Sequence, residues 1–346
     1  SQVTEEKFES FKKSTPLAET PFGGQAHDWD LPLQFHNSVW SADRTVAFLE
    51  EHDSNQPFLL AVGFEDPHHP HAVPLEFEDR VRPEDVPLPD FTEGELNDKP
   101  PHFVAAREGR LEELSTRGEY AMAGQGAGFD FSKVSERDAR TGRAYYYTMC
   151  RLIDREMGRI LDALDRTGQA QNTIVIFTTD HGELLGDHGL WMKGPFHYDQ
   201  LINVPCIVRW PDRMPGGQSI HGLFSHADIV PTLLAAAGVE SDGISDGVDA
   251  LPLLRGESES VRDDLLVECI DDPIGLRLKT LVTPERKLTW YTGQSYGELY
   301  DLESDPAEKI NRWNDPQYAE EKSELLGRLL DYGETLEPRS ERHCYA

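Results

Sequence analysis

Residues 172–193 read NTIVIFTTDHGELLGDHGLWMK, and this stretch decides the fold class. Its β-branched and aromatic residues between Thr173 and Thr179 predict a buried strand of a parallel sheet. Asp180 and His181 follow directly, and in an open α/β sheet the carboxyl ends of the strands face the ligand crevice. A carboxylate beside an imidazole suits a divalent cation: the oxygen favours calcium or magnesium, and the nitrogen also admits zinc or manganese. The pair is therefore a candidate metal site.

Lys193 ends the same stretch and offers a fixed positive charge to an anionic substrate. The simpler alternative is that Asp180 caps the next helix and that Lys193 is a solvated surface lysine. Because two-residue motifs recur by chance, the dipeptide alone leaves both interpretations open.

The composition limits the class of protein and its partners. With 346 residues, the chain can hold one large domain and a smaller one. It has 63 acidic against 33 basic residues and a net charge of -30, which argues against nucleic acid because phosphates would be repelled. A salt-loving source and an ordinary acidic protein both explain such a surface. No apolar run approaches the roughly 20 residues of a membrane span, and the lack of a signal-peptide core slightly favours the cytoplasm, while the compartment stays open.

A histidine-rich loop follows another apolar run. Residues 57–64, PFLLAVGF, have the length of a strand, and residues 66–74 read DPHHPHAVP. Two prolines bracket two histidines and stiffen this loop, so we expect its imidazoles at the same edge of the sheet as Asp180. For His69 and His71 we expect exposed loop positions outside the site.

The predicted strands alternate with a long helix. Between Ser135 and Gly168 the sequence predicts a helix with one apolar stripe that packs on the sheet and leads into the strand at 173–179. Residues 204–210, VPCIVRW, repeat the strand signal, and the alternation predicts a parallel sheet flanked by helices. The stripe consists of Tyr146, Met149, Ile153, Met157, Ile160 and Leu164.

Other N-terminal segments are less regular. Residues 1–36 predict an irregular lead-in, and Ser38 or Ser41 can cap a helix that closes near Asp53. Residues 75–135 predict a long excursion over the surface.

The C-terminal part has a different order of predicted elements. A helix at 225–238 contains His226 and Asp228, which we interpret as cap and core residues rather than catalytic ones. After Gly247, strands follow one another with no helix between them, which predicts an antiparallel sheet. The chain closes with a helix at about 317–337. Its expected buried residues are Leu325, Leu326, Leu329 and Leu330.

These motifs resemble the sulfatase family, within the alkaline phosphatase superfamily. The opening stretch is similar to the family's second signature, in which an Asp-His or Asp-Asn pair ends a central strand and a lysine follows Gly-x-His-Gly. The resemblance implies that Asp180 and His181 bind one calcium ion and that Lys193 contacts the sulfate. The histidine-rich loop resembles the family's Pro-His-x-Pro segment, which implies that His68 hydrogen-bonds the sulfate. His68 and Lys193 are then the predicted catalytic and substrate-binding residues.

The resemblance covers most of the chain. Residues 298–311, ELYDLESDPAEKIN, are similar to the family's C-terminal signature, and residues 86–100 resemble an excursion that borders the substrate pocket. The implied fold is α/β, with an alkaline-phosphatase-like, mostly parallel sheet flanked by helices and incomplete in this chain. Residues 1–250 are then the C-terminal portion of the sulfatase α/β catalytic domain. Residues 251–346 are a small subdomain with an antiparallel sheet and a terminal helix.

The implied activity is that of a sulfuric ester hydrolase acting on a small-molecule or carbohydrate sulfate monoester. The family's nucleophile is a formylglycine made from the first residue of a Cys-x-Pro-x-Arg or Ser-x-Pro-x-Arg motif, and no cysteine or serine here is followed by x-Pro-x-Arg. We therefore expect the N-terminal sulfatase segment that carries it to be a missing partner, and this chain alone to have little or no activity. A fragment, a cleaved two-chain enzyme and a gene remnant all fit this expectation.

Two other functions stay open. A phosphate- or phosphonate-ester hydrolase of the same superfamily shares Asp-His-Gly after the strand but generally builds a transition-metal site with more histidine. A non-catalytic fragment would bind anions or a partner chain without turnover. Lys193, the Pro-His-x-Pro loop and the C-terminal signature favour the sulfatase.

Overall fold

The structure is a computed structural model. Residues 1–25 of the predicted lead-in and residues 115–128 of the predicted surface excursion lie outside the residues that it describes. The described residues are 26–53, 55–114, 129–240, 246–271 and 274–335.

The longest helix, α4 (Glu136–Arg166), confirms the helix predicted between Ser135 and Gly168. The Ser135 hydroxyl accepts the backbone N–H of Asp138, 3.2 Å away, and so caps the first turn. Gly168 follows the helix with a φ of +72°, a left-handed conformation that favours glycine. Four members of the predicted apolar stripe are buried, namely Met149, Ile153, Ile160 and Leu164.

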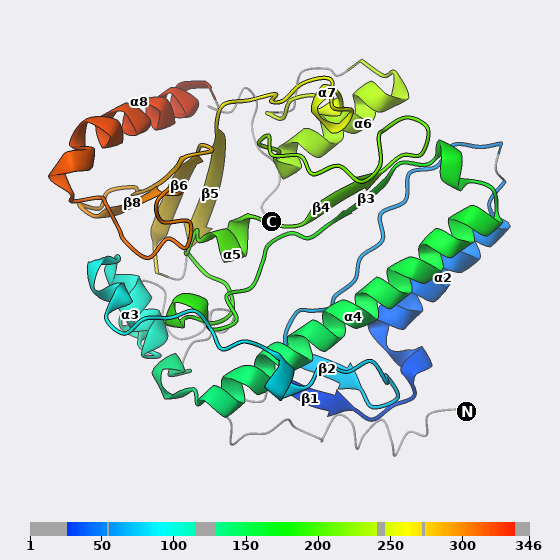
Figure 1. Ribbon diagram of the computed structural model, residues 1–346, viewed down its shortest axis with the longest axis horizontal. Helices are drawn as coiled ribbons and strands as arrows, with labels where there is room; N and C mark the ends of the chain where they lie inside the picture. Colours follow the sequence, from blue (N-terminus) through cyan, green and yellow to red (C-terminus); the bar gives the residue numbers. More distant parts are fainter. Residues whose placement is uncertain (1–25, 54, 115–128, 241–245, 272–273, 336–346) are drawn as a thin grey trace.

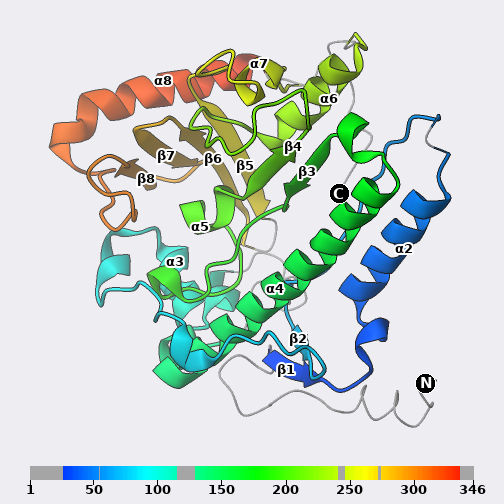
Figure 2. The same cartoon turned by 45° about the vertical axis from the view of Figure 1, so that its right-hand side comes forward.

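A second helix, α2 (Asn37–Glu51), lies alongside α4 (Figures 1 and 2). Its N-cap is His36, so the prediction of Ser38 or Ser41 as the cap is wrong. Ser38 lies inside the first turn, where its hydroxyl donates a hydrogen bond to Asp66. That carboxylate belongs to the histidine-rich loop, so the beginning of α2 supports the loop.

The parallel pairing in the described residues lies between β1 (Ala26–Trp29) and β2 (His71–Pro74), with Ala26 opposite His71. Both strands pack against α4 (Figure 1). β1 falls in the predicted irregular lead-in and β2 in the predicted loop. Neither four-residue segment has an alternating or continuous apolar pattern, so sequence reasoning could not detect them.

A two-stranded ribbon contains the two strands of the central prediction. β3 (Val175–Thr178) and β4 (Cys206–Arg209) form where expected, but they pair antiparallel, with Val175 opposite Arg209. Both are half-buried or exposed rather than buried. Residues 57–64 form no strand, and Leu59 is 91% exposed. An apolar run becomes a strand only where a neighbour pairs with it, which explains this difference.

The C-terminal sheet confirms the antiparallel prediction. Its strand order is β5-β6-β7-β8, and α8 (Ala319–Thr335) packs against it (Figure 1). Leu325 and Leu329 of α8 are buried as predicted, whereas Leu330 is 59% exposed. The strands are β5 (Leu265–Asp271), β6 (Leu276–Val282), β7 (Arg286–Tyr291) and β8 (Gly297–Asp301).

The remaining elements connect these layers. Residues 75–114 and 129–135 are not a surface excursion throughout, because Leu96 and Phe103 are buried in the largest core, together with Tyr291 and Tyr300 from the C-terminal sheet. The short helices are α3 (Pro101–Arg107), α5 (Asp199–Ile202), α6 (Ile229–Ala237) and α7 (Leu251–Leu254).

The helix predicted at 225–238 is a 3₁₀ turn followed by α6. Ser225 and Asp228 form a capping box, and Asp228 is fully buried, which confirms the cap and core interpretation of that carboxylate. Within the described part of the chain, no helix combines the length and apolar character that crossing a membrane requires.

Candidate functional site

Asp180 and His181 follow the end of β3 and face each other across a short gap. Nε2 of His181 lies 3.5 Å from Oδ2 of Asp180, and the other carboxylate oxygen accepts the His181 backbone N–H at 2.9 Å. Partial burial raises the pKa of Asp180, but His181 and the hydrogen bonds to the carboxylate outweigh it and hold that pKa below its usual value. Asp180 is therefore an anionic oxygen donor at neutral pH.

The pair fits a divalent cation. Nδ1 of His181 lies 2.8 Å from the carbonyl oxygen of Gly182 and must donate to it, which leaves the Nε2 lone pair directed toward Asp180 in the neutral ring. With metal–oxygen distances of about 2.3–2.6 Å, two neighbouring ligands of one calcium ion lie about 3.3–3.7 Å apart. The 3.5 Å gap matches that spacing. Among the described residues, no group of three or more His, Cys, Asp or Glu side chains is placed to hold a metal.

The histidine-rich loop is fixed to the start of α2. His36 lies 3.1 Å from the carbonyl oxygen of Ala72 through Nε2 and 3.5 Å from the carboxylate of Asp66 through Nδ1. It thus joins the two ends of the loop. Within the loop, Nδ1 of His68 donates to the carbonyl oxygen of His69 at 2.6 Å, and the two imidazoles stack with centroids 4.3 Å apart. His68 is exposed, so its Nε2 can reach a ligand.

His69 is influenced by the charges of three predicted site residues. Burial lowers the pKa of His69 to about 4, and the charges of His68, Lys193 and His181 lower it further. Each of these three groups therefore lies within electrostatic range of His69, and His181 in turn lies 3.5 Å from Asp180. His68, Lys193 and His181 therefore lie close enough to His69 for their charges to act on it, although we expected His69 to be an exposed loop residue. That expectation is also wrong for His71, which is only 6% exposed.

Glu183 shapes the loop that leads to Lys193. Its Oε1 accepts the backbone N–H of Leu185 at 3.2 Å and that of Met192. The N–H of Leu184 donates to the carbonyl oxygen of Met192 at 3.2 Å, which closes the loop at its base. Burial raises the pKa of Glu183 to about 7, against the opposing effects of these N–H groups and of Lys193. Nothing in its spacing distinguishes Glu183 from the other acidic residues, so the sequence did not reveal it.

The polypeptide after Asp180 turns in a confined space. A Cβ atom added to Gly182 would lie 1.8 Å from the carbonyl oxygen of Gln200. Glycine is required there because the backbone itself occupies the position of a side chain. The Gly182 N–H donates to the carbonyl oxygen of Leu201 at 2.8 Å, so the chain before Lys193 is joined to the chain after it.

The C-terminal sheet fixes the segment that follows Lys193. His197 is buried and its Nδ1 lies 2.7 Å from the hydroxyl of Thr280 in β6. Lys287 of β7 is fully buried, contacts the carboxylate of Asp199, and donates to the carbonyl oxygen of His197 at 3.2 Å. The position of Lys193 thus depends on residues nearly a hundred positions later in the chain.

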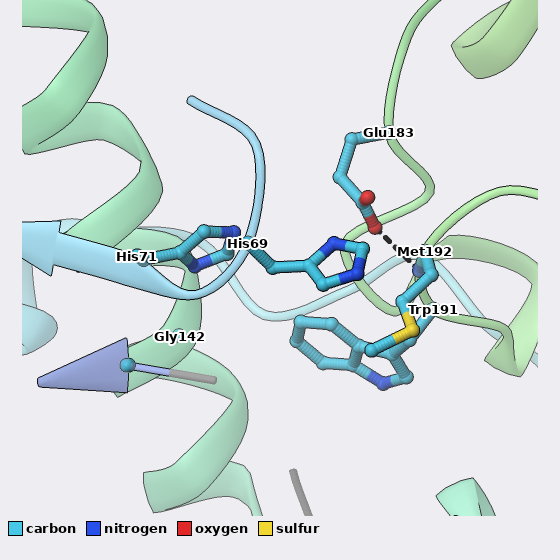
Figure 3. A pocket seen from close by; sticks show the side chains of 7 residues that line it. His69, His71, Gly142, Glu183, Trp191 and Met192 are labelled. Atoms are coloured by element: carbon cyan, nitrogen blue, oxygen red, sulfur yellow. Dashed lines mark hydrogen bonds between the residues drawn. The ribbon is translucent and has the colours of Figure 1, made fainter. Parts of the chain in front are cut away.

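A small pocket opens beside these residues (Figure 3). The His69 ring lies between Glu183 and Trp191, Met192 lies beside the Glu183 carboxylate, and His71 comes from β2. The cavity between them is only about 20 Å³, which is room for about one water molecule.

Comparison with known proteins identifies the family. The profile of the sulfatase family matches residues 5–239, and that of the N-sulphoglucosamine sulphohydrolase C-terminal domain matches residues 186–335. The uncharacterized sulfatase YidJ of Escherichia coli (strain K12) is 28% identical over 294 residues, covering 84% of this chain and 54% of the relative. The arylsulfatase of Clostridium perfringens (strain 13 / Type A) is 27% identical over 305 residues, covering 87% of this chain and 58% of the relative.

Solved structures show the same fold. The phosphonate monoester hydrolase of Agrobacterium radiobacter superposes with a TM-score of 0.71 at 27% identity, covering 86% of this chain and 60% of that one. The phosphonate monoester hydrolase SpPMH from Silicibacter pomeroyi superposes with a TM-score of 0.72 at 23% identity, covering 90% and 63%. The fold is thus the alkaline-phosphatase-like α/β fold of sulfatases and their relatives. The chain belongs to the sulfatase family, and it spans little more than half the length of the curated relatives above.

Proposed function

We propose that this chain supplies part of the cation and sulfate site of a sulfuric ester hydrolase that acts on a sulfate monoester with one calcium ion. The observation that carries the proposal is the 3.5 Å gap between Asp180 and His181, with the second ring nitrogen of His181 engaged by Gly182. Membership of the sulfatase family supports the reaction class. A bound calcium ion would polarise the sulfate and offset charge on its non-bridging oxygens.

His68 and Lys193 have separate roles in this proposal. The Lys193 ammonium donates charge-assisted hydrogen bonds to sulfate oxygens and stabilises the negative charge that develops as the ester bond breaks. His68, whose Nδ1 is held by the His69 carbonyl, presents Nε2 to the ester. In its protonated form it donates to the sulfate or to the departing alcohol oxygen. Lys193 is the alternative proton donor to the alcohol.

The nucleophile is the part that this chain does not supply in the proposal. None of its cysteines or serines begins a Cys-x-Pro-x-Arg or Ser-x-Pro-x-Arg motif. We propose that a further sulfatase segment carries a formylglycine at that position and completes the calcium site. The half-length match to relatives supports this, as do Leu59 and Ile207, which are 91% and 63% exposed near the central ribbon.

The decisive experiment uses the complete protein. We expect it to release sulfate from an aryl sulfate, to lose that activity after chelation, and to regain it with calcium. A complete protein that binds sulfate and is stabilised by it, but releases none from any ester, would instead be a non-catalytic anion-binding protein.

A second candidate is hydrolysis of a phosphonate or phosphate ester. The 27% identity and TM-score of 0.71 with the phosphonate monoester hydrolase of Agrobacterium radiobacter favour it. Metal content separates the two candidates. One tightly held calcium ion supports the sulfatase, whereas two zinc or manganese ions per protein would support the phosphorus chemistry.

A further inference from the structure

A buried residue near each end of the loop of residues 184–192, which separates Glu183 from Lys193, adopts an unusual backbone conformation. Leu185 has a φ of +48° and Met192 a φ of +65°, and both values lie in the left-handed region that residues with side chains rarely adopt. Both residues are buried. Such a conformation persists only where the surrounding structure holds it. Contacts at both ends of the loop must therefore maintain these two conformations.

One carboxylate oxygen contacts both of these residues. Oε1 of Glu183 accepts the backbone N–H of Leu185 at 3.2 Å and that of Met192 (Figure 3). Beside them, the backbone N–H of Leu184 donates to the carbonyl oxygen of Met192 at 3.2 Å. Glu183 thus joins the beginning of the loop to its end.

Arg143 of α4 holds the first half of the same loop. Its Nη1 donates to the carbonyl oxygen of Leu185 at 3.2 Å and to a carboxylate oxygen of Asp187 at 2.9 Å. Glu183 differs because its contacts include Met192, the residue directly before Lys193. Of these two side chains, Glu183 is the one that contacts the end of the loop.

Met192 sets the direction in which the chain reaches Lys193. Because φ and ψ are the soft dihedrals of the backbone, a change of Met192 to the common extended or helical region would redirect the chain at Lys193. The charge of Lys193 lowers the pKa of Glu183 and that of His69, so Lys193 lies within electrostatic range of both groups. The turn at Met192 is thus part of what brings Lys193 back toward Glu183 and His69.

We propose that Glu183 is a positioning residue, which places the Lys193 ammonium at the sulfate by holding Met192 in its left-handed conformation. The proposal rests on the proposed sulfatase function and gives Glu183 no contact with the ester. Its role depends on the reach of Oε1, since one oxygen has to meet two N–H groups from opposite ends of the loop. An amide oxygen at the same place can accept both hydrogen bonds, whereas a side chain shorter by one methylene cannot reach both.

Two substitutions in the complete protein separate reach from charge, with methylumbelliferyl sulfate as the substrate. Glu183→Asp keeps the charge but withdraws the oxygen, and it should lower kcat at least tenfold while KM stays within threefold of wild type. Glu183→Gln keeps the oxygen without the charge and should retain kcat within threefold. If Glu183 acts through Lys193, Glu183→Asp should lower kcat no further in a protein that already carries Lys193→Ala.

A matched control shortens another buried carboxylate. Glu156 of α4 has a side chain that is 0% exposed and pairs with Arg155 and Arg159. Glu156→Asp should therefore leave kcat within threefold of wild type even where it lowers the free energy of unfolding. A loss of kcat that merely followed the loss of stability would appear in this control as well, and it would overturn the proposal.

Hydrogen exchange at the Met192 amide separates this proposal from the proposed function, because it requires no turnover. Exchange should be at least tenfold faster in Glu183→Asp than in wild type, and it should stay slow in Glu183→Gln. If no ester releases sulfate, the proposed function fails, and this exchange still decides whether Glu183 holds the turn.

Three results would overturn the positioning role even if sulfate is released normally. They are unchanged exchange and kcat in Glu183→Asp, an equal loss of kcat in Glu183→Gln, and a further loss when Glu183→Asp is added to Lys193→Ala. If Glu183→Asp does not fold, Glu183→Gln decides: wild-type kcat with slow Met192 exchange supports the proposal, and a tenfold loss of kcat overturns it.

Discussion

Nζ of Lys287 lies 2.7 Å from Oε1 of Glu308, and the two side chains are 0% and 1% exposed. Glu308 also accepts the backbone N–H of Asp199 at 2.7 Å through its other oxygen. This buried ion pair therefore joins the C-terminal sheet to the segment that follows Lys193. A buried charge pair contributes mainly to positioning, since desolvation offsets much of its attraction.

Replacing Lys287 by methionine tests this connection. Lys287→Met would leave Glu308 buried without its cation, and we expect a loss of about 3–5 kcal/mol in the free energy of unfolding. The double variant Lys287→Met, Glu308→Gln removes the unpaired charge and should recover much of that loss. Denaturant unfolding of the three proteins measures both effects. Equal stability of the single variant and wild type would show that the pair does not hold the segment.

The buried imidazole of His197 predicts a weakness in acid. Burial lowers its pKa from 6.5 to about 4, and the charge of Lys287 contributes. Between these two values the unfolded state binds a proton that the folded state does not. The contribution to stability is therefore complete above pH 6.5 and is lost as the pH falls toward 4, by about 3 kcal/mol at most.

Unfolding measurements at several pH values check this sign. His197→Gln keeps a side chain that can hydrogen-bond to Thr280 but cannot titrate, so its free energy of unfolding should fall less steeply than that of wild type between pH 6.5 and 4. Parallel curves for the two proteins would mean that other groups cause the acid sensitivity.

The cation site gives a prediction for Asp180. Asp180→Asn removes the anionic oxygen 3.5 Å from His181 and should weaken calcium binding by the complete protein at least tenfold. Asp154 is an exposed carboxylate of α4, and Asp154→Asn provides a control with the same chemical change. Calorimetric titration measures both affinities. If Asp180→Asn binds calcium as tightly as the control, Asp180 is not a ligand.

The sequence predicted those helices and strands whose own residues form a recognisable pattern. Ser135 and Gly168 mark the ends of α4, and the four C-terminal strands follow one another with no helix between them, which predicted their antiparallel pairing. Pairing between distant segments was not accessible in the same way. β1 and β2 lack a pattern, and the antiparallel arrangement of β3 and β4 depends on what lies beside them rather than on their residues.

The candidate site was predictable where a motif marked it. Asp180, His181, Lys193 and His68 lie in recognisable segments, and their roles remain predictions until they are tested. No motif marks His69 or Glu183. His69 is an additional histidine in a loop, and Glu183 is one of 63 acidic residues. Only burial and the contacts to Met192 and Leu185 single out Glu183. The domain boundary at residue 250 also stays a prediction, since the largest core draws on both sides of it.

The central claim is that Lys193 meets the sulfate of an ester beside the cation site, and turnover of an aryl sulfate by the complete protein tests it most directly. Lys193→Ala should lower kcat on the order of a hundredfold to a thousandfold with little change in stability, because the lysine meets charge that develops in the transition state. Lys133→Ala, which removes an exposed lysine 76% accessible to solvent, should turn over like wild type. Unchanged turnover by Lys193→Ala would contradict the account.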